Sequence, residues 1–436
     1  MSYAAAIESL FALAGELHSA PGQRRRKFDL EHMRVLAEAL GHPERKFPSV
    51  LIAGTNGKGS TSATLASILQ AAGYRTGLYT SPHLVRVNER VRIHGAEISD
   101  DDFARLYFTV DDVARRLVHE GRLPHPPSFF ETMTALAFSA FAQAKLDIAV
   151  LEVGMGGRLD ATNIVDPLLS IITDISLDHT EWLGPTISAI AREKAGILRP
   201  GGVMVTLSQH PEANQVLGEV ATALKVRGVN AAEYLPPRSV ASGPYPLQLL
   251  GEQVEIASPL AGQHQQRNLA LAIAAAVELS NHHGYRTTPA QIAEGIQNTR
   301  WPGRLESFRS ISGARILLDV GHNPAGAWAL RAALAQTSEQ PRVLIFGCLK
   351  DKPVFEMAQI LFPLFDRVLL SVVDSPRAAD MAELEAAAQA TGAAYEAMPD
   401  AGTALRYAQE MVPASGLIVG TGSVYLVGKL RAELAQ

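Results

Sequence analysis

Cysteine is almost absent from this 436-residue chain, and long runs of apolar residues are absent altogether. The single Cys348 excludes an intramolecular disulfide and a zinc site built on cysteines, which fits the cytoplasm, where we expect the protein. The first residues lack the apolar segment of a signal peptide. The longest apolar run, Leu269 to Val277, is too short to cross a bilayer, so we expect a buried helix there and no membrane association.

Charge is sparse as well. Charged residues make up 19% of the chain and the formal net charge is −5, so we expect no nucleic-acid partner. One short basic cluster, Arg24 to Lys27, is interpreted as a solvated loop or as a steering group for an anionic substrate. The length exceeds one ordinary hydrophobic core and predicts two domains. We expect a monomer.

A strand, a glycine loop and a helix follow one another around Lys58. In this order backbone N–H groups and a helix N-terminus converge on a phosphate, and the lysine adds positive charge. Gly59 separates the lysine from the hydroxyl that usually follows it, so Ser60 or Thr61 must reach Mg²⁺. A merely structural turn is the alternative. The predicted nucleotide-binding residues are Thr55, Asn56, Gly57, Lys58, Gly59 and Ser60.

Helices and apolar strands alternate along residues 1–298. The glycine loop around Lys58, a second glycine-rich loop from Gly154 to Gly157 and the pair Asp178-His179 follow predicted strands, which is where doubly wound sheets bind ligands. The predicted fold class is therefore α/β, with a P-loop-containing, doubly wound parallel sheet. The expected strands are 76–79, 85–93 (as a strand or hairpin), 148–153 and 168–172, with a small β excursion in 236–262. The expected helices are 3–18, 29–40, 128–144, 265–281 and 289–298.

Residues 299–304 are interpreted as a hinge, and the alternation restarts beyond them. Residues 305–436 predict a smaller, Rossmann-like α/β domain. Gly420 to Ser423 is interpreted as a glutamate-binding or closure loop, or equally as a strand–helix turn. The expected strands lie near 315–320, 342–347, 366–372 and 416–420.

Three charged or titratable residues invite a chemical interpretation. Glu152 ends an apolar strand and either caps a neighbouring loop or ligates Mg²⁺, since a buried carboxylate is costly without a partner. His179 is either a hydrogen-bonded structural histidine or a ligand, although Mg²⁺ prefers oxygen. Lys194 alone would be an ordinary surface lysine on a helix.

The motifs around these residues resemble the folylpolyglutamate synthase/dihydrofolate synthase family, a branch of the Mur ligase superfamily. The resemblance spans nearly the whole chain in the right order. Glu152 to Asn163, which reads Glu-Val-Gly-Met-Gly-Gly-Arg-Leu-Asp-Ala-Thr-Asn, is its most specific segment. The other matching segments are Ala53 to Ser60, Thr80 to Leu84, Leu177 to Gly184 and Arg192 to Ile197.

The resemblance implies ATP and Mg²⁺ as cofactors. It implies that Lys58 and its loop hold the phosphates, with Asn268 at the adenine and with Arg304, Asp319 and His322 from the second domain. Asp319 and His322 as plain turn residues are the alternative. The implied catalytic residues are Lys58, Glu152, His179 and Lys194. The implied metal ligands are Ser81, Glu152, His179 and Lys194, the last as a carbamate formed with CO₂.

The resemblance also implies a pterin site. Paired phenylalanines could stack on the flat ring or could be the buried face of their helix, where Ser128 and Glu131 have the pattern of a capping box. Glu31 and His32 depart from the family's Gly-Leu, which bears on the first part of this site. The implied residues are Asp29, Ser128, Phe129, Phe130, Glu131, Leu159 and Asp160.

The implied reaction is ATP-dependent amide formation through an acyl phosphate. L-Glutamate is added to dihydropteroate and to folates that already carry glutamate, and Gly157 to Asn163 resembles the bacterial enzymes that do both. A single-function folylpolyglutamate synthase, a Mur-type cell-wall ligase and a non-catalytic nucleotide-binding regulator are the alternatives. The cell-wall ligase should lack Gly59, and the regulator would not need Glu152, His179 and Lys194 together.

Overall fold

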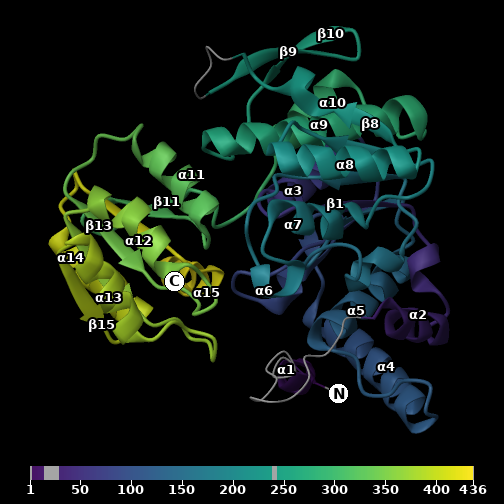
Figure 1. Cartoon of the computed structure of the whole chain (residues 1–436), viewed down its shortest axis with the longest axis horizontal. Helices are drawn as coiled ribbons and strands as arrows, with labels where there is room; N and C mark the ends of the chain where they lie inside the picture. Colours follow the sequence, from purple (N-terminus) through teal and green to yellow (C-terminus); the bar gives the residue numbers. More distant parts are fainter. Residues whose placement is uncertain (1, 14–28, 238–242, 436) are drawn as a thin grey trace.

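The computed structural model describes residues 2–13, 29–237 and 243–435 and contains two α/β domains, each built around its own sheet. Figure 1 shows the second domain, from green to yellow, beside the first. The basic cluster at 24–27 and the end of the helix expected at 3–18 lie outside the described residues. In the described part of the chain, no helix is long and apolar enough to cross a membrane.

The first sheet has eight strands in the order β4-β3-β2-β5-β1-β6-β7-β8. Six strands are parallel, while β3 and β4 form an antiparallel edge. The parallel, doubly wound sheet is thus confirmed. The strands are β1 (Ser49–Ala53), β2 (Thr76–Tyr79), β3 (Val91–Ile93), β4 (Ala96–Glu97), β5 (Ile148–Glu152), β6 (Leu169–Ile172), β7 (Val203–Thr206) and β8 (Arg227–Asn230).

Both faces of this sheet are covered by helices, which is why its central strands are buried throughout and mostly apolar. Val50 and Ile52 enter the core beneath α3 (Lys58–Ala71), α9 (Gln263–His282) and α10 (Pro289–Gln297). Leu51 enters the core beneath α4 (Asp100–His119) and α5 (Phe129–Ala144). A hairpin of β9 (Tyr245–Leu249) and β10 (Glu252–Ile256) confirms the expected β excursion. The helices are α1 (Tyr3–Ala12), α2 (Leu30–Ala39), α3 (Lys58–Ala71), α4 (Asp100–His119), α5 (Phe129–Ala144), α6 (Thr180–Leu183), α7 (Ile187–Ala195), α8 (Pro211–Ala223), α9 (Gln263–His282) and α10 (Pro289–Gln297).

One predicted element is partly wrong. Residues 85–93 were expected to form a strand or hairpin, but only Val91–Ile93 is a strand and Val87–Arg90 is a 3-10 turn. The cause is Glu89, whose carboxylate accepts hydrogen bonds from the backbone N–H groups of Leu84, Val85 and Arg86. These bonds coil the chain before the strand can begin.

The second sheet has the order β11-β12-β16-β13-β14-β15, with β11 antiparallel at its edge. Cys348 follows β13 and is fully buried. The strands are β11 (Glu306–Arg309), β12 (Arg315–Leu318), β13 (Arg342–Phe346), β14 (Arg367–Ser371), β15 (Tyr395–Met398) and β16 (Leu417–Thr421). The helices are α11 (Pro324–Leu334), α12 (Val354–Leu361), α13 (Met381–Thr391), α14 (Ala401–Met411) and α15 (Val424–Leu434). The sequence prediction did not include β4, β8, β11 or β15.

Candidate active site

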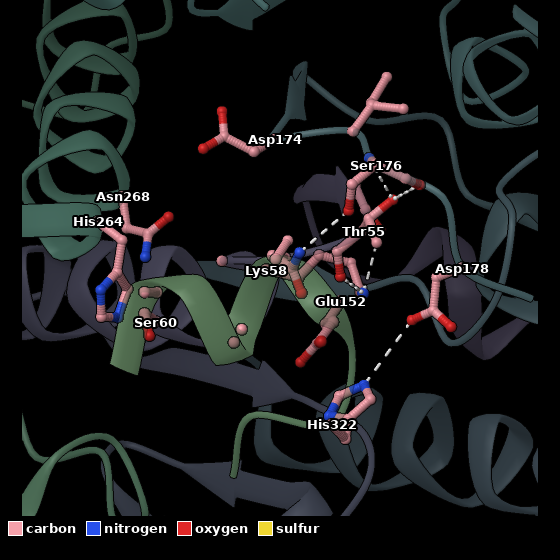
Figure 2. A pocket seen from close by; sticks show the side chains of 18 of the residues that line it. Thr55, Lys58, Ser60, Glu152, Asp174, Ser176, Asp178, His264, Asn268 and His322 are labelled. Atoms are coloured by element: carbon pink, nitrogen blue, oxygen red, sulfur yellow. Dashed lines mark hydrogen bonds and ion pairs between the residues drawn. The ribbon is translucent and has the colours of Figure 1, made fainter. Parts of the chain in front are cut away.

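A cavity of about 520 Å³ lies between the two domains, within the size range of small-molecule sites. It is lined by the loop after β1, by the residues that follow β5 and β6, and by the start of the second domain. Figure 2 shows His264 and Asn268 on one side of the view and Asp178 and His322 on the other. Every residue predicted for ATP or metal lines it: Thr55, Asn56, Gly57, Lys58, Gly59, Ser60, Ser81, Glu152, His179, Lys194, Asn268, Arg304, Asp319 and His322.

The phosphate loop is held tightly. Gly57 has φ 89°, and a Cβ there would lie 2.1 Å from Asn268 Oδ1, so only glycine fits between the loop and α9. Lys58 begins α3 and its Nζ donates to the carbonyl oxygens of Gly54 and Thr55, both at 3.1 Å. The ammonium group is therefore held against the loop by the loop's own carbonyl oxygens.

The two candidate hydroxyls after Lys58 have different surroundings. Ser60 lines the cavity. Thr61 is buried, and its hydroxyl donates to the carbonyl oxygen of Asn268 at 3.4 Å. Both residues are buried, and of the two only Ser60 lines the cavity.

Glu152 ends β5 with its carboxylate almost wholly buried. Burial raises its pKa to about 7, although Lys58 and the backbone N–H of Ser81, 3.3 Å from Oε2, oppose the shift. The carboxyl group beside the phosphate loop therefore loses its proton only near neutral pH. A nearby cation would ionise it.

Lys194 is not a surface lysine, and that simplest interpretation of the sequence is wrong. It lies on α7 with its side chain buried, and Nζ donates to the carbonyl oxygen of Gly54 at 2.7 Å. Burial, with Lys58 nearby, lowers its pKa to about 7. A large fraction of this amine is therefore uncharged at neutral pH.

His179 follows β6 in the left-handed conformation, with φ 49°. Its backbone N–H donates to Asp178 Oδ1 at 2.9 Å, which fixes this turn before α6. Burial lowers the imidazole pKa to about 4 despite Asp178, so the ring is neutral and able to ligate a cation.

The second domain places an arginine against the same cavity. Burial lowers the pKa of Arg304, while Asp319 and Glu152 oppose that shift. Asp319 also caps its turn, accepting from the N–H groups of Leu305 at 3.1 Å and Gly321 at 2.9 Å. His322 Nδ1 lies 2.9 Å from the carbonyl oxygen of Val320. Asp319 and His322 are therefore turn residues and also line the cavity, so the two interpretations are compatible.

Two sets of side chains at the cleft were not predicted. Arg267 forms a bidentate pair with Asp174, with Nη2 and Nε 2.6 and 2.9 Å from its oxygens. Lys352 and Asn323 of the second domain both reach Asp178 in the first. Asn323 before Pro324 has the pattern of a helix N-cap, which was the one available signal. Nothing local marks Lys352.

None of the residues predicted for the pterin lines this cavity, although Phe130 and Asp160 contact Gly154 and Met155 in its wall. Asp29 caps α2, and Ser128 and Glu131 form the expected capping box of α5. Asp160 accepts from Met155 N, Thr162 N and the Thr162 hydroxyl. Leu159 precedes it in the same turn.

The two phenylalanines are half-buried and make different contacts. The Phe129 ring packs against Phe11, with centroids 5.8 Å apart. The Phe130 ring lies against Gly154, where a Cβ would meet Cζ at 2.5 Å. Glu131 lines a separate small hollow with His32 and His125.

Family models match both domains of the chain. Residues 52–276 match the Mur ligase middle domain, and residues 303–424 match the Mur ligase glutamate ligase domain. Among curated proteins, a dihydrofolate synthase/folylpolyglutamate synthase of Bacillus subtilis is 34% identical over 93% of this chain and 94% of its own length. That of Mycobacterium tuberculosis is 37% identical over 82% of this chain and 77% of its own.

Solved structures of such enzymes superpose closely. The M. tuberculosis folylpolyglutamate synthase complexed with ADP and AMPPCP has a TM-score of 0.87 and 34% identity, covering 99% of both chains. Escherichia coli FolC in complex with DHPP and ADP has a TM-score of 0.84 and 31% identity, covering 98% of this chain and 97% of its own.

A phosphate loop facing a glutamate ligase domain across one polar cleft defines a Mur-type, ATP-dependent ligase. Within that class, the chain belongs to the dihydrofolate synthase/folylpolyglutamate synthase family. The family and the enzyme class expected from the motifs are confirmed, and the interpretation as a non-catalytic regulator is excluded.

Proposed function

We propose that this ligase joins L-glutamate to two acceptors, dihydropteroate and folates that already carry glutamate. The observation that carries the proposal is the cleft itself, where Lys58, Glu152 and Lys194 of the nucleotide domain face Arg304 of the glutamate ligase domain. Relatives named for both activities, at 34% and 37% identity, support the choice of two acceptors.

The chain's own groups suit a two-step acyl transfer. A carboxylate oxygen of the acceptor attacks the γ-phosphorus of ATP, the bond to ADP breaks, and an acyl phosphate forms. The glutamate amine then attacks the acyl carbon, phosphate leaves, and the amine loses a proton. Lys58 and Arg304 would offset the negative charge that develops, and closure of the two domains would keep water from the acyl phosphate.

The residues present fit a divalent cation. Glu152, Ser81 and His179 supply a carboxylate, a hydroxyl and a neutral imidazole to one cavity. In the described part of the chain, no three His, Cys, Asp or Glu side chains converge as a ready-made metal site. A carbamate on Lys194 would add the missing oxygen ligand. Mg²⁺ held there would neutralise phosphate charge.

The state of Lys194 supports that modification. Its buried amine has a pKa of about 7 and so can attack CO₂ as the free base, forming an N–C bond and releasing one proton. The product is anionic and would lie beside Gly54, whose carbonyl oxygen now accepts from the amine.

We further propose that the acceptor's pterin binds at the turn and helix start formed by Asp29, Ser128, Phe129, Phe130, Glu131, Leu159 and Asp160. E. coli FolC is known in complex with DHPP, which supports a dedicated site in such a chain. The half-buried rings of Phe129 and Phe130 are the flat surfaces available there.

The test is a phosphate-release assay with ATP, Mg²⁺ and L-glutamate, run separately with dihydropteroate and with tetrahydrofolate. Turnover with both acceptors is expected. Turnover with tetrahydrofolate alone would make the enzyme a single-function folylpolyglutamate synthase, the name borne by a Lacticaseibacillus casei relative at 35% identity. Silence with both acceptors would refute the proposal.

A further inference from the structure

The carboxylate of Asp178 joins the two domains. Its Oδ1 accepts from Lys352 Nζ at 2.7 Å and from the N–H of its neighbour His179 at 2.9 Å. Its Oδ2 accepts from Asn323 Nδ2 at 3.3 Å and faces His322 Nε2 at 3.8 Å. Asp178 and His179 follow β6 in the first domain, whereas Lys352, Asn323 and His322 belong to the second.

The ion pair at the centre of this contact is largely removed from water. The side chains of Lys352 and Asp178 are only 5% and 10% exposed. Removing one partner would leave the other charge buried and unpaired, which is strongly unfavourable, so a change at either residue should disturb the seating of the domains at this point. Lys352 has one other carboxylate nearby, Asp351 Oδ2 at 3.8 Å, and Asp351 is itself paired with Arg377.

Asn323 extends the contact to the phosphate loop. As the N-cap of α11, its Oδ1 accepts from the N–H of Gly326 at 2.9 Å, which fixes the orientation of the amide. Its Nδ2 then points into the first domain and donates to Asn56 Oδ1 at 3.0 Å as well as to Asp178. The start of α11 therefore positions both the phosphate loop and the Asp178 turn.

We propose that Lys352 is a positioning residue for the ligase reaction. By pairing with Asp178 it seats the second domain on the first and holds His179 at the cation site and Asn56 at the phosphates. This inference rests on the proposed function but adds a residue to which that function assigns no role. Lys352 acts through Asp178 and does not itself contact a substrate.

The test compares Lys352→Met, Asp178→Asn and the double variant with Lys429→Met. The control removes a lysine of the same domain whose Nζ lies 3.0 Å from Glu433 on the exposed face of α15. Each variant is checked by circular dichroism and thermal melting. The double variant leaves neither charge unpaired, so it keeps the test available if a single variant does not fold.

We expect Lys352→Met to lower kcat on the order of 100-fold. The KM for L-glutamate should stay within about 3-fold, because the residue does not bind it. The double variant should be no slower than the slower single variant, since both changes break one contact. Small-angle scattering with a non-hydrolysable ATP analogue should give Lys352→Met a larger radius of gyration than the wild type and Lys429→Met.

Three results would overturn the proposal for Lys352. A higher KM for L-glutamate at unchanged kcat would make Lys352 a substrate-binding residue and overturn the proposal. So would additive losses in the double variant, or an unchanged radius of gyration. A wild type inactive with both acceptors would instead refute the proposed function, and the scattering comparison would still decide the role of Lys352.

Discussion

Gly59 packs against the indole ring of Trp301. A Cβ built on Gly59 would lie 2.9 Å from Cζ2 and 3.0 Å from Nε1 of that ring. Trp301 belongs to the connection between the two domains, and the guanidinium of Arg92 lies 5.5 Å from its ring centroid. The extra glycine of the phosphate loop thus has a physical reason, because it makes room for a side chain of the predicted hinge.

We therefore expect Gly59→Ala to raise the KM for ATP by about 10-fold or more, since forced overlap in a packed region typically costs 1–3 kcal/mol. Trimming the ring in Gly59→Ala/Trp301→Leu should recover part of the loss. Gly218→Ala is the matched control, because Gly218 lies on α8 with open space at its Cβ. The KM for ATP of each variant is measured by steady-state kinetics at varied ATP concentration. An equal increase in Gly59→Ala and Gly218→Ala would contradict the steric explanation.

The buried carboxyl of Glu152 should make stability depend on pH. Its pKa is raised from 4.5 to about 7 by burial, so its contribution to folding is fully present below pH 4.5 and is lost as pH rises through 7. Glu152→Gln removes this dependence. In urea unfolding without Mg²⁺, the variant should gain on the wild type by roughly 3 kcal/mol between pH 4.5 and 8.

That comparison has a built-in check. Mg²⁺ and ATP should stabilise the wild type at pH 8 by binding near the ionised carboxylate, and should stabilise Glu152→Gln much less. Parallel stability curves for the two proteins across this pH range would show that Glu152 ionises normally in the folded state.

Replacing Lys194 should nearly abolish turnover. Lys194→Ala removes the amine that would carry the carbamate, so we expect a loss on the order of 100-fold or more that excess bicarbonate does not restore. With ¹³C-labelled bicarbonate, the wild type should show a carbamate carbon signal that the variant lacks. Wild-type turnover by Lys194→Ala would contradict the carbamate.

Replacing Phe130 should weaken binding of the acceptor's pterin without affecting binding of the nucleotide. Phe130→Ala removes the ring that lies against Gly154, and we expect the KM for dihydropteroate to rise about 10-fold from lost aromatic contact. The KM for ATP should hardly change. Phe108→Ala, at another half-buried phenylalanine on α4, is the control. Equal effects on both substrates in Phe130→Ala would indicate a structural role alone.

The sequence predicts best what local chemistry dictates. The loop from Gly54 to Ser60 and the end of β5 were predictable because strand, glycine and helix signals lie within one short segment. The ion pair of Lys352 with Asp178 was not, because 174 residues separate partners that only domain packing brings together. Residues 87–90 were mispredicted because Glu89, a side chain, outcompetes strand pairing for the backbone N–H groups.

The burial of Cys348 has a practical consequence for studying how the domains move. Apolar surroundings raise the pKa of this thiol to about 12, so at neutral pH it is protonated and shielded from alkylating dyes. Because it is also the chain's sole cysteine, thiols introduced on α6 and α12 could be labelled without first removing it. The natural sequence is thereby ready for single-molecule distance measurements across the cleft during turnover.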